Sequence, residues 1–90
     1  MPRWIAEGTV DEWDNIRRFR EELSDSSNWR PNPRTTVTTV LSLGNGSFLA
    51  ECHAVHQEDF EAWLENKGWE VKSITPVRYA ANSGSIWEVK

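Results

Sequence analysis

The stretch TTVTTVLSLGNGSFLAECHAV, residues 35–55, decides the fold of this chain. Both of its halves are rich in β-branched and apolar residues, and a Gly-Asn-Gly segment separates them. This pattern predicts a hairpin with strands at 35–43 and 47–55 and a turn at 44–46. Alternate residues of a strand share a face, and the expected sets are Val37, Thr39, Leu41 and Leu43 in the first strand and Phe48, Ala50, Cys52 and Ala54 in the second.

The segment after the hairpin predicts a helix at residues 57–67, with an apolar stripe of Phe60, Trp63 and Leu64. Gly68 is expected to end this helix in a left-handed conformation, with Trp69 folding back onto the last turn. Residues 69–79 predict a strand that Pro76 interrupts, as an edge strand allows. A turn at 80–84 and a short last strand at 85–90 complete the chain.

The segment before the hairpin predicts a strand at residues 3–7 and a helix that ends near Leu23. Thr9 and Glu12 have the spacing of a capping box, which places the helix start directly after the strand. Four apolar residues then share one helix face: Trp13, Ile16, Phe19 and Leu23. A polar turn follows at residues 24–28.

The resulting order is strand, helix, hairpin, helix, strand, which predicts an α+β, ferredoxin-like (split βαβ) two-layer sandwich. Two helices are expected to cover one face of an antiparallel sheet, leaving the other face open, with an extra C-terminal strand. The 90 residues fit a single domain, 1–90. This fold accommodates many unrelated functions, so it predicts the shape of the protein and not its activity.

Composition narrows the class of protein. The net charge is −4, which disfavours nucleic-acid binding through charge alone. The apolar runs are too short to span a membrane, the start lacks the apolar stretch of a secretory signal, and there is one cysteine, so a cytoplasmic protein is expected. Six tryptophans exceed what a thin core hides easily, and tryptophan is enriched at binding hot spots.

The segment from Cys52 to His56 holds the candidate metal ligands and the candidate nucleophile. Cys52 and His53 are neighbours on a strand and point to opposite faces, so they cannot bind one ion together. The apolar neighbours of Cys52 favour core packing over a reactive thiolate. Acidic residues near helix starts are explained by the helix dipole. We therefore expect no catalytic centre, no metal site and no cofactor.

Two known families share the predicted topology but not its motifs. Residues 8–10, Gly-Thr-Val, lack the phosphate-binding arginine that acylphosphatases carry between the first strand and helix. Residues 46–52 hold one aromatic side chain and an acid, unlike the base-stacking strand of RNA-recognition domains.

The segment from Trp29 to Arg34 is the strongest candidate for a binding site. An indole there stands among two arginines and two prolines. In one interpretation Trp29 closes one end of the core. In the other, Trp29 anchors a stiff recognition loop, and Arg30 and Arg34 contact acidic groups on a partner. Arg17 and Arg18 belong to a second cationic cluster in the first helix.

These features predict a small non-enzymatic protein–protein binding module. In size, acidity and lack of motifs the chain resembles small phage-encoded inhibitors of host machinery, including anti-CRISPR proteins. That resemblance implies an inhibitor or regulator whose partner is a larger protein or nucleoprotein complex. A single-stranded nucleic-acid binder is the first alternative, acting through the Trp29 loop or through an aromatic on the open face such as Trp4. A small-molecule sensor or small enzyme in an oligomer is the second. A homodimer through the sheet face or edge, with Trp87 in the contact, is compatible with all three.

Overall fold

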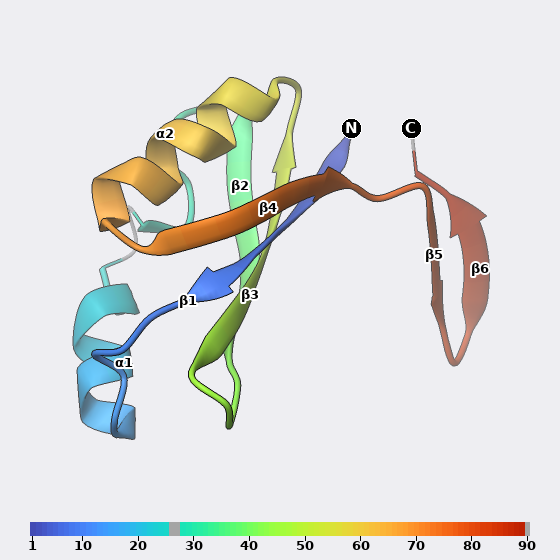
Figure 1. The fold of residues 1–90 in the computed structure, drawn as a ribbon. Coiled ribbons are helices and arrows are strands. Elements are labelled where there is room, and N and C mark those ends of the chain that lie inside the picture. The colour runs from blue at the N-terminus through green and yellow to red at the C-terminus, as the bar shows by residue number, and fades with distance from the viewer. Residues whose placement is uncertain (26–27, 90) are drawn as a thin grey trace.

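A computed structural model describes residues 1–25 and 28–89 of the chain as an α+β protein (Figure 1). Its described elements are β1 (Arg3–Thr9), α1 (Ile16–Leu23), β2 (Thr35–Ser42), β3 (Ser47–Ala54), α2 (Gln57–Lys67), β4 (Glu70–Pro76), β5 (Tyr79–Asn82) and β6 (Ser85–Glu88). The main sheet has the strand order β2-β3-β1-β4, and every neighbouring pair is antiparallel. A separate two-stranded sheet holds β5 and β6.

The hairpin predicted from residues 35–55 is confirmed, and β3 is a central strand of the main sheet. Its predicted apolar set, Phe48, Ala50, Cys52 and Ala54, is 0–1% exposed. Phe60, Trp63 and Leu64 of α2 and Leu23 of α1 belong to the same buried cluster. We call this the closed side of the sheet. The opposite side, which we call the open side, carries Ile5, Leu49 and Glu51, directly paired or adjacent across β1 and β3.

The prediction of which β2 residues share the buried face is wrong after Val37. The register with β3 shifts between Val37 and Thr39, as a bulge does when two residues oppose one. The extra residue reverses the alternation, so Val40 is buried and Leu41 lies on the other side of the sheet, 47% exposed. Leu41 thereby joins the open side.

The predicted start of the first helix is also wrong, because Thr9 is not a helix cap. Thr9 is the last residue of β1, paired with Ser47 and Glu70, and its hydroxyl donates to the Glu70 carboxylate at 3.3 Å. The actual cap is Asn15, whose side-chain oxygen accepts the backbone N–H of Arg18 at 3.0 Å. Trp13 therefore lies in the connection before α1.

The second helix matches its prediction at both ends. It spans Gln57–Lys67, and Gly68 follows with φ of 75°. The Gly68 N–H donates to the carbonyls of Leu64 and Glu65, and Trp69 is buried directly after the turn.

The C-terminal residues do not extend the main sheet as predicted. β4 ends at Pro76, which has no backbone N–H to donate, and residues 79–82 form a strand where a turn was expected. Residues 77–89, with β5 and β6, form a hairpin that stands apart from the main sheet (Figure 1), and we call it the arm. Residues 26 and 27 of the predicted turn, and residue 90 of the predicted last strand, lie outside the described residues.

Candidate partner-binding site

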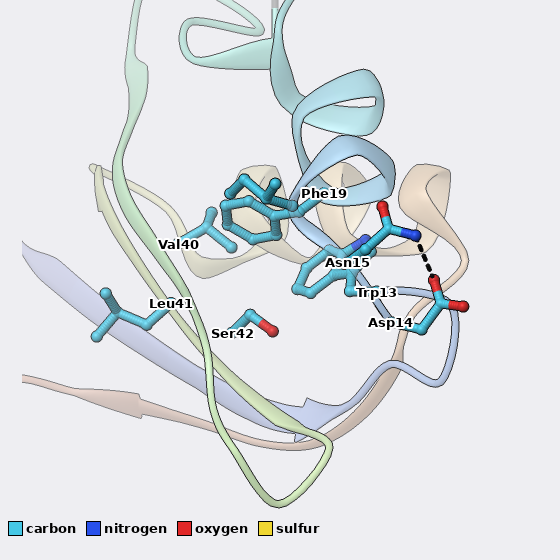
Figure 2. A pocket seen from close by; sticks show the side chains of 8 residues that line it. Trp13, Asp14, Asn15, Phe19, Val40, Leu41 and Ser42 are labelled. Carbon is cyan, nitrogen blue, oxygen red and sulfur yellow. Dashed lines mark hydrogen bonds between the residues drawn. The ribbon is translucent and has the colours of Figure 1, made fainter.

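An apolar groove runs between α1 and β2. Two adjoining hollows, of about 420 and 230 Å³, make up the groove and share Ile16, Phe19 and Val40 as lining residues. Trp13 and Ser42 line the larger hollow, whose side chains Figure 2 shows, and Leu23 and Trp29 line the smaller one.

The helix wall of the groove follows from the spacing of apolar residues in α1. Ile16, Phe19 and Leu23 lie three and four residues apart and share one helix face. Leu23 is buried in the core and Phe19 packs against it, whereas Ile16 at the start of the helix is 66% exposed. The groove thus offers an aliphatic side chain that the chain itself does not cover.

Trp13 lines the larger hollow, and its indole is fixed by ring contacts and a hydrogen bond. Its indole ring meets Phe19 edge-on, with centroids 4.8 Å apart, and meets Trp69 in the same way at 4.8 Å. Its indole N–H donates to Oε2 of Glu22, whose Oε1 accepts the Trp69 indole at 2.5 Å. One carboxylate therefore ties two tryptophans together, an arrangement that the sequence did not suggest because residues 13, 22 and 69 meet only in the folded chain.

The strand wall of the groove is the free edge of the main sheet. Val40, Leu41 and Ser42 all line the larger hollow although their side chains alternate between the two sides of the sheet. These three residues are consecutive, so the hollow runs along their backbone. β2 is the terminal strand in the order β2-β3-β1-β4, and this backbone forms its outer edge.

The alternation of hydrogen-bonded and non-hydrogen-bonded pairs in the hairpin shows which backbone groups of β2 face outward. The Leu43 N–H donates to the Ser47 carbonyl at 2.9 Å, so this pair bonds within the hairpin. Bonded and non-bonded pairs alternate in an antiparallel ladder. The backbone N–H and C=O groups of Val40 and Ser42 therefore point away from β3, toward the groove.

The earlier part of the same edge already contacts the loop before β2. The Val37 N–H donates to the Trp29 carbonyl at 2.8 Å, so the loop before β2 lies against the strand there. The Trp29 side chain packs against the core, and its indole N–H donates to the Leu23 carbonyl at 3.1 Å. Trp29 thus closes one end of the core and lines the smaller hollow of the groove, instead of projecting as an exposed anchor.

Neither hollow of the groove is lined by any of the four arginines predicted as binding residues: Arg17, Arg18, Arg30 and Arg34. Arg20 lines the smaller hollow, and Arg30 follows Trp29 and is exposed. Arg34 is exposed and its guanidinium lies 3.7 Å from the Asp59 carboxylate. Arg17 lies 3.8 Å from Glu21 on the surface of α1. Arg18 is about 200° around the helix from Ile16, so it faces away from the groove.

The other candidate aromatic, Trp4, does not lie on the open side of the sheet. Trp4 pairs with Cys52 in the register, packs against the buried cluster, and donates its indole N–H to the Ala54 carbonyl at 2.9 Å. The period-two alternation of β1 places Ile5 on the open side instead.

The cysteine and histidine candidates are Cys52 and His53 of β3 and His56 directly before α2. Burial, together with the nearby Asp59 charge, raises the pKa of the Cys52 thiol to about 12, so it stays protonated at neutral pH. Burial lowers the pKa of His53, with Arg3 contributing. Within residues 1–25 and 28–89 no three His, Cys, Asp or Glu side chains gather as a metal site would need.

Comparison with protein-family models, with curated proteins and with solved structures finds no match to this chain. In the described part of the chain, neither helix has the length and apolar composition that crossing a bilayer requires.

Proposed function

We propose that this chain is a small non-enzymatic protein–protein binding module, and that the groove between α1 and β2 is its docking site. The observation that carries the proposal is the meeting of an uncovered apolar wall with a free strand edge. Ile16 provides the uncovered apolar side chain, and the outward backbone groups of Val40 and Ser42 provide the free strand edge.

The partner segment that suits such a site is extended. A peptide that adds to a sheet edge gains backbone hydrogen bonds, and its alternate side chains reach the neighbouring pocket. The bond from the Val37 N–H to the carbonyl of the turn residue Trp29 shows one outward group of this edge binding backbone. The partner strand would continue along Val40 and Ser42 and place an apolar side chain between Ile16 and Phe19.

Charge complementarity favours an acidic residue at one end of the segment. The charged side chains that line the groove are Arg20 in the smaller hollow and Asp14 in the larger one. An acidic residue at the Arg20 end would meet this guanidinium at the rim, where charge speeds association.

The biological role that fits this proposal is inhibition or regulation of a larger host complex, as for the phage-encoded inhibitors that the sequence resembles. The strand order β2-β3-β1-β4 supports a ferredoxin-like arrangement, with the arm as an addition to it.

A library of short peptides that alternate apolar and acidic residues tests the proposal. We expect a subset to bind the full chain, to slow hydrogen exchange at the Val40 and Ser42 amides, and to bind Ile16→Asp at least 10-fold more weakly. Ile86→Asp, at an exposed isoleucine of the arm, is the matched control and should bind normally. Peptides that bind both variants equally, or oligonucleotides that bind in their place and dissociate as salt rises, would contradict the proposal.

A further inference from the structure

The groove between α1 and β2 has ends of opposite charge. Asp14 lines the larger hollow together with Ser42, the last residue of β2. Arg20 lines the smaller hollow together with Trp29. The Trp29 carbonyl accepts the Val37 N–H, so the Arg20 end of the groove lies toward the start of β2. A segment bound along the groove therefore meets a carboxylate at one end and a guanidinium at the other.

The Arg20 guanidinium forms no ion pair with any acid among residues 1–25 and 28–89. The two glutamates that follow it in α1 have other partners, since Glu21 lies 3.8 Å from Arg17 and Glu22 binds two indoles. The Ser24 hydroxyl lines the same hollow and is a second donor there. The other lining residues are apolar: Ile16, Phe19, Leu23, Trp29 and Val40. This hollow suits a carboxylate that arrives together with an apolar side chain.

The free edge of β2 is short and ends near Arg20. Val40 and Ser42 have outward backbone groups, but the next outward N–H toward the start of the strand, that of Val37, is bonded to the Trp29 carbonyl. A partner strand that follows the edge from Ser42 past Val40 therefore meets the loop that holds Trp29. A segment whose chain ends at this point matches the length of the free edge.

Charge selects the direction of a segment that ends there. If it runs antiparallel to β2, from Ser42 toward Val40, its C-terminal carboxylate lies at the Arg20 end and away from Asp14. If it ran parallel, a free N-terminal ammonium would lie beside Arg20, where like charges repel. The antiparallel direction also continues the pattern of the main sheet, in which every neighbouring pair is antiparallel.

We propose that the groove binds the free C-terminus of a partner protein as an antiparallel strand, with the terminal carboxylate between the Val40 N–H and the Arg20 guanidinium. This inference rests on the proposed function of the groove and names the part of the partner that it binds. One carboxylate oxygen accepts the outward backbone N–H and the other faces the guanidinium, and hydrogen bonds of this charged kind are the strong ones.

The same pairing specifies two side chains of the partner. Val40 and Ser42 lie on the closed side of the sheet, and residues directly opposite each other on neighbouring strands share a face. The last residue of the partner, opposite Val40, therefore directs its side chain into the smaller hollow. The residue two positions earlier, opposite Ser42, directs its side chain toward Trp13 in the larger hollow. Both are expected to be apolar.

Fluorescence polarisation with labelled peptides tests the terminal carboxylate on the full chain. The probes are short synthetic peptides with leucine as the last residue and two positions earlier, and a lysine toward the amino end to face Asp14. We expect the free acids to bind roughly 10-fold more tightly than the same peptides made as C-terminal amides. Free acids extended beyond the last leucine by a pair of glycines should bind as weakly as the amides, because the edge is closed at Val37.

Two arginine variants identify the group that recognises the carboxylate. Arg20→Gln should remove the preference for the free acid and leave the binding of the amide unchanged, which a merely structural role would not do. Arg18→Gln, on the face of α1 turned away from the groove, is the matched control and should keep the preference. Circular dichroism confirms that each variant is folded.

The outcomes separate this inference from the proposed function. Amides or extended peptides that bind as tightly as the free acids, yet slow hydrogen exchange at the Val40 and Ser42 amides, would leave the groove as the docking site and overturn C-terminal recognition. A preference for the free acid that Arg20→Gln leaves unchanged would also overturn it. Peptides that bind Ile16→Asp as well as the unmodified chain, or no binding by any peptide, would overturn both proposals.

Discussion

Strand β3 has two sides that differ in what they contact, although their residues alternate along a single segment. On the closed side, Phe48 and Cys52 are fully buried beneath helices and indoles. On the open side, Leu49 and Glu51 are half-buried and border a shallow hollow. The difference shows that this small domain concentrates its packing on one layer and leaves part of its apolar surface exposed on the other.

The tryptophans follow the same division. Five of the six have an indole N–H bonded inside the molecule: those of Trp4, Trp13, Trp29, Trp63 and Trp69. Buried indoles need such partners, and here one glutamate and three backbone carbonyls provide them. The tryptophan surplus is therefore mainly a means of filling a thin core, and two of these fixed indoles, Trp13 and Trp29, also line the proposed groove.

The largest expected effect comes from truncating neighbours on β3. Phe48→Ala should lower the free energy of unfolding by about 3–5 kcal/mol, since it empties a fully buried site. Leu49→Ala should cost about 1 kcal/mol or less, because its side chain is already partly in water. Urea unfolding of dilute protein, followed by tryptophan fluorescence, measures both. Equal losses would show that the two sides are packed alike.

A smaller difference in unfolding free energy is expected between substitutions of two neighbouring glutamates of α1. Glu22→Ala leaves the Trp13 and Trp69 indoles without their acceptor and should cost roughly 2 kcal/mol. Glu21→Ala removes only a surface contact with Arg17 and should change the unfolding free energy by about 0.5 kcal/mol or less. If the two substitutions have similar effects in the same urea assay, the indole pair does not depend on Glu22.

The sequence predicts the closed side well because its signals are local. Alternation identified the buried residues of β3, and Gly68 identified the end of α2 through a conformation that glycine adopts without strain. The proposed docking groove depends on contacts between distant residues. Thr9 has the spacing of a helix cap, but its pairing with Ser47 and Glu70 keeps it in β1 and leaves Asn15 to cap α1.

The groove could not be predicted for a related reason. Its strand wall depends on the bulge after Val37, which exchanges the faces of Val40 and Leu41 and which no residue between 35 and 43 marks clearly. The arginines predicted from sequence do not line the groove, whereas their neighbour Arg20 does. Trp29 was found too, but its contact with the Leu23 carbonyl makes it part of the core.

Fluorescence quenching by acrylamide tests most directly whether the tryptophans divide between core and surface in this way. Trp87 is the most exposed indole, at 39%, and lies on the arm, outside the main sheet. We predict that Trp87→Phe removes the easily quenched part of the emission and that Trp29→Phe does not. If Trp29→Phe removed it and Trp87→Phe had no effect, Trp29 would be the exposed anchor, and the division between core and surface drawn from β3 would be wrong.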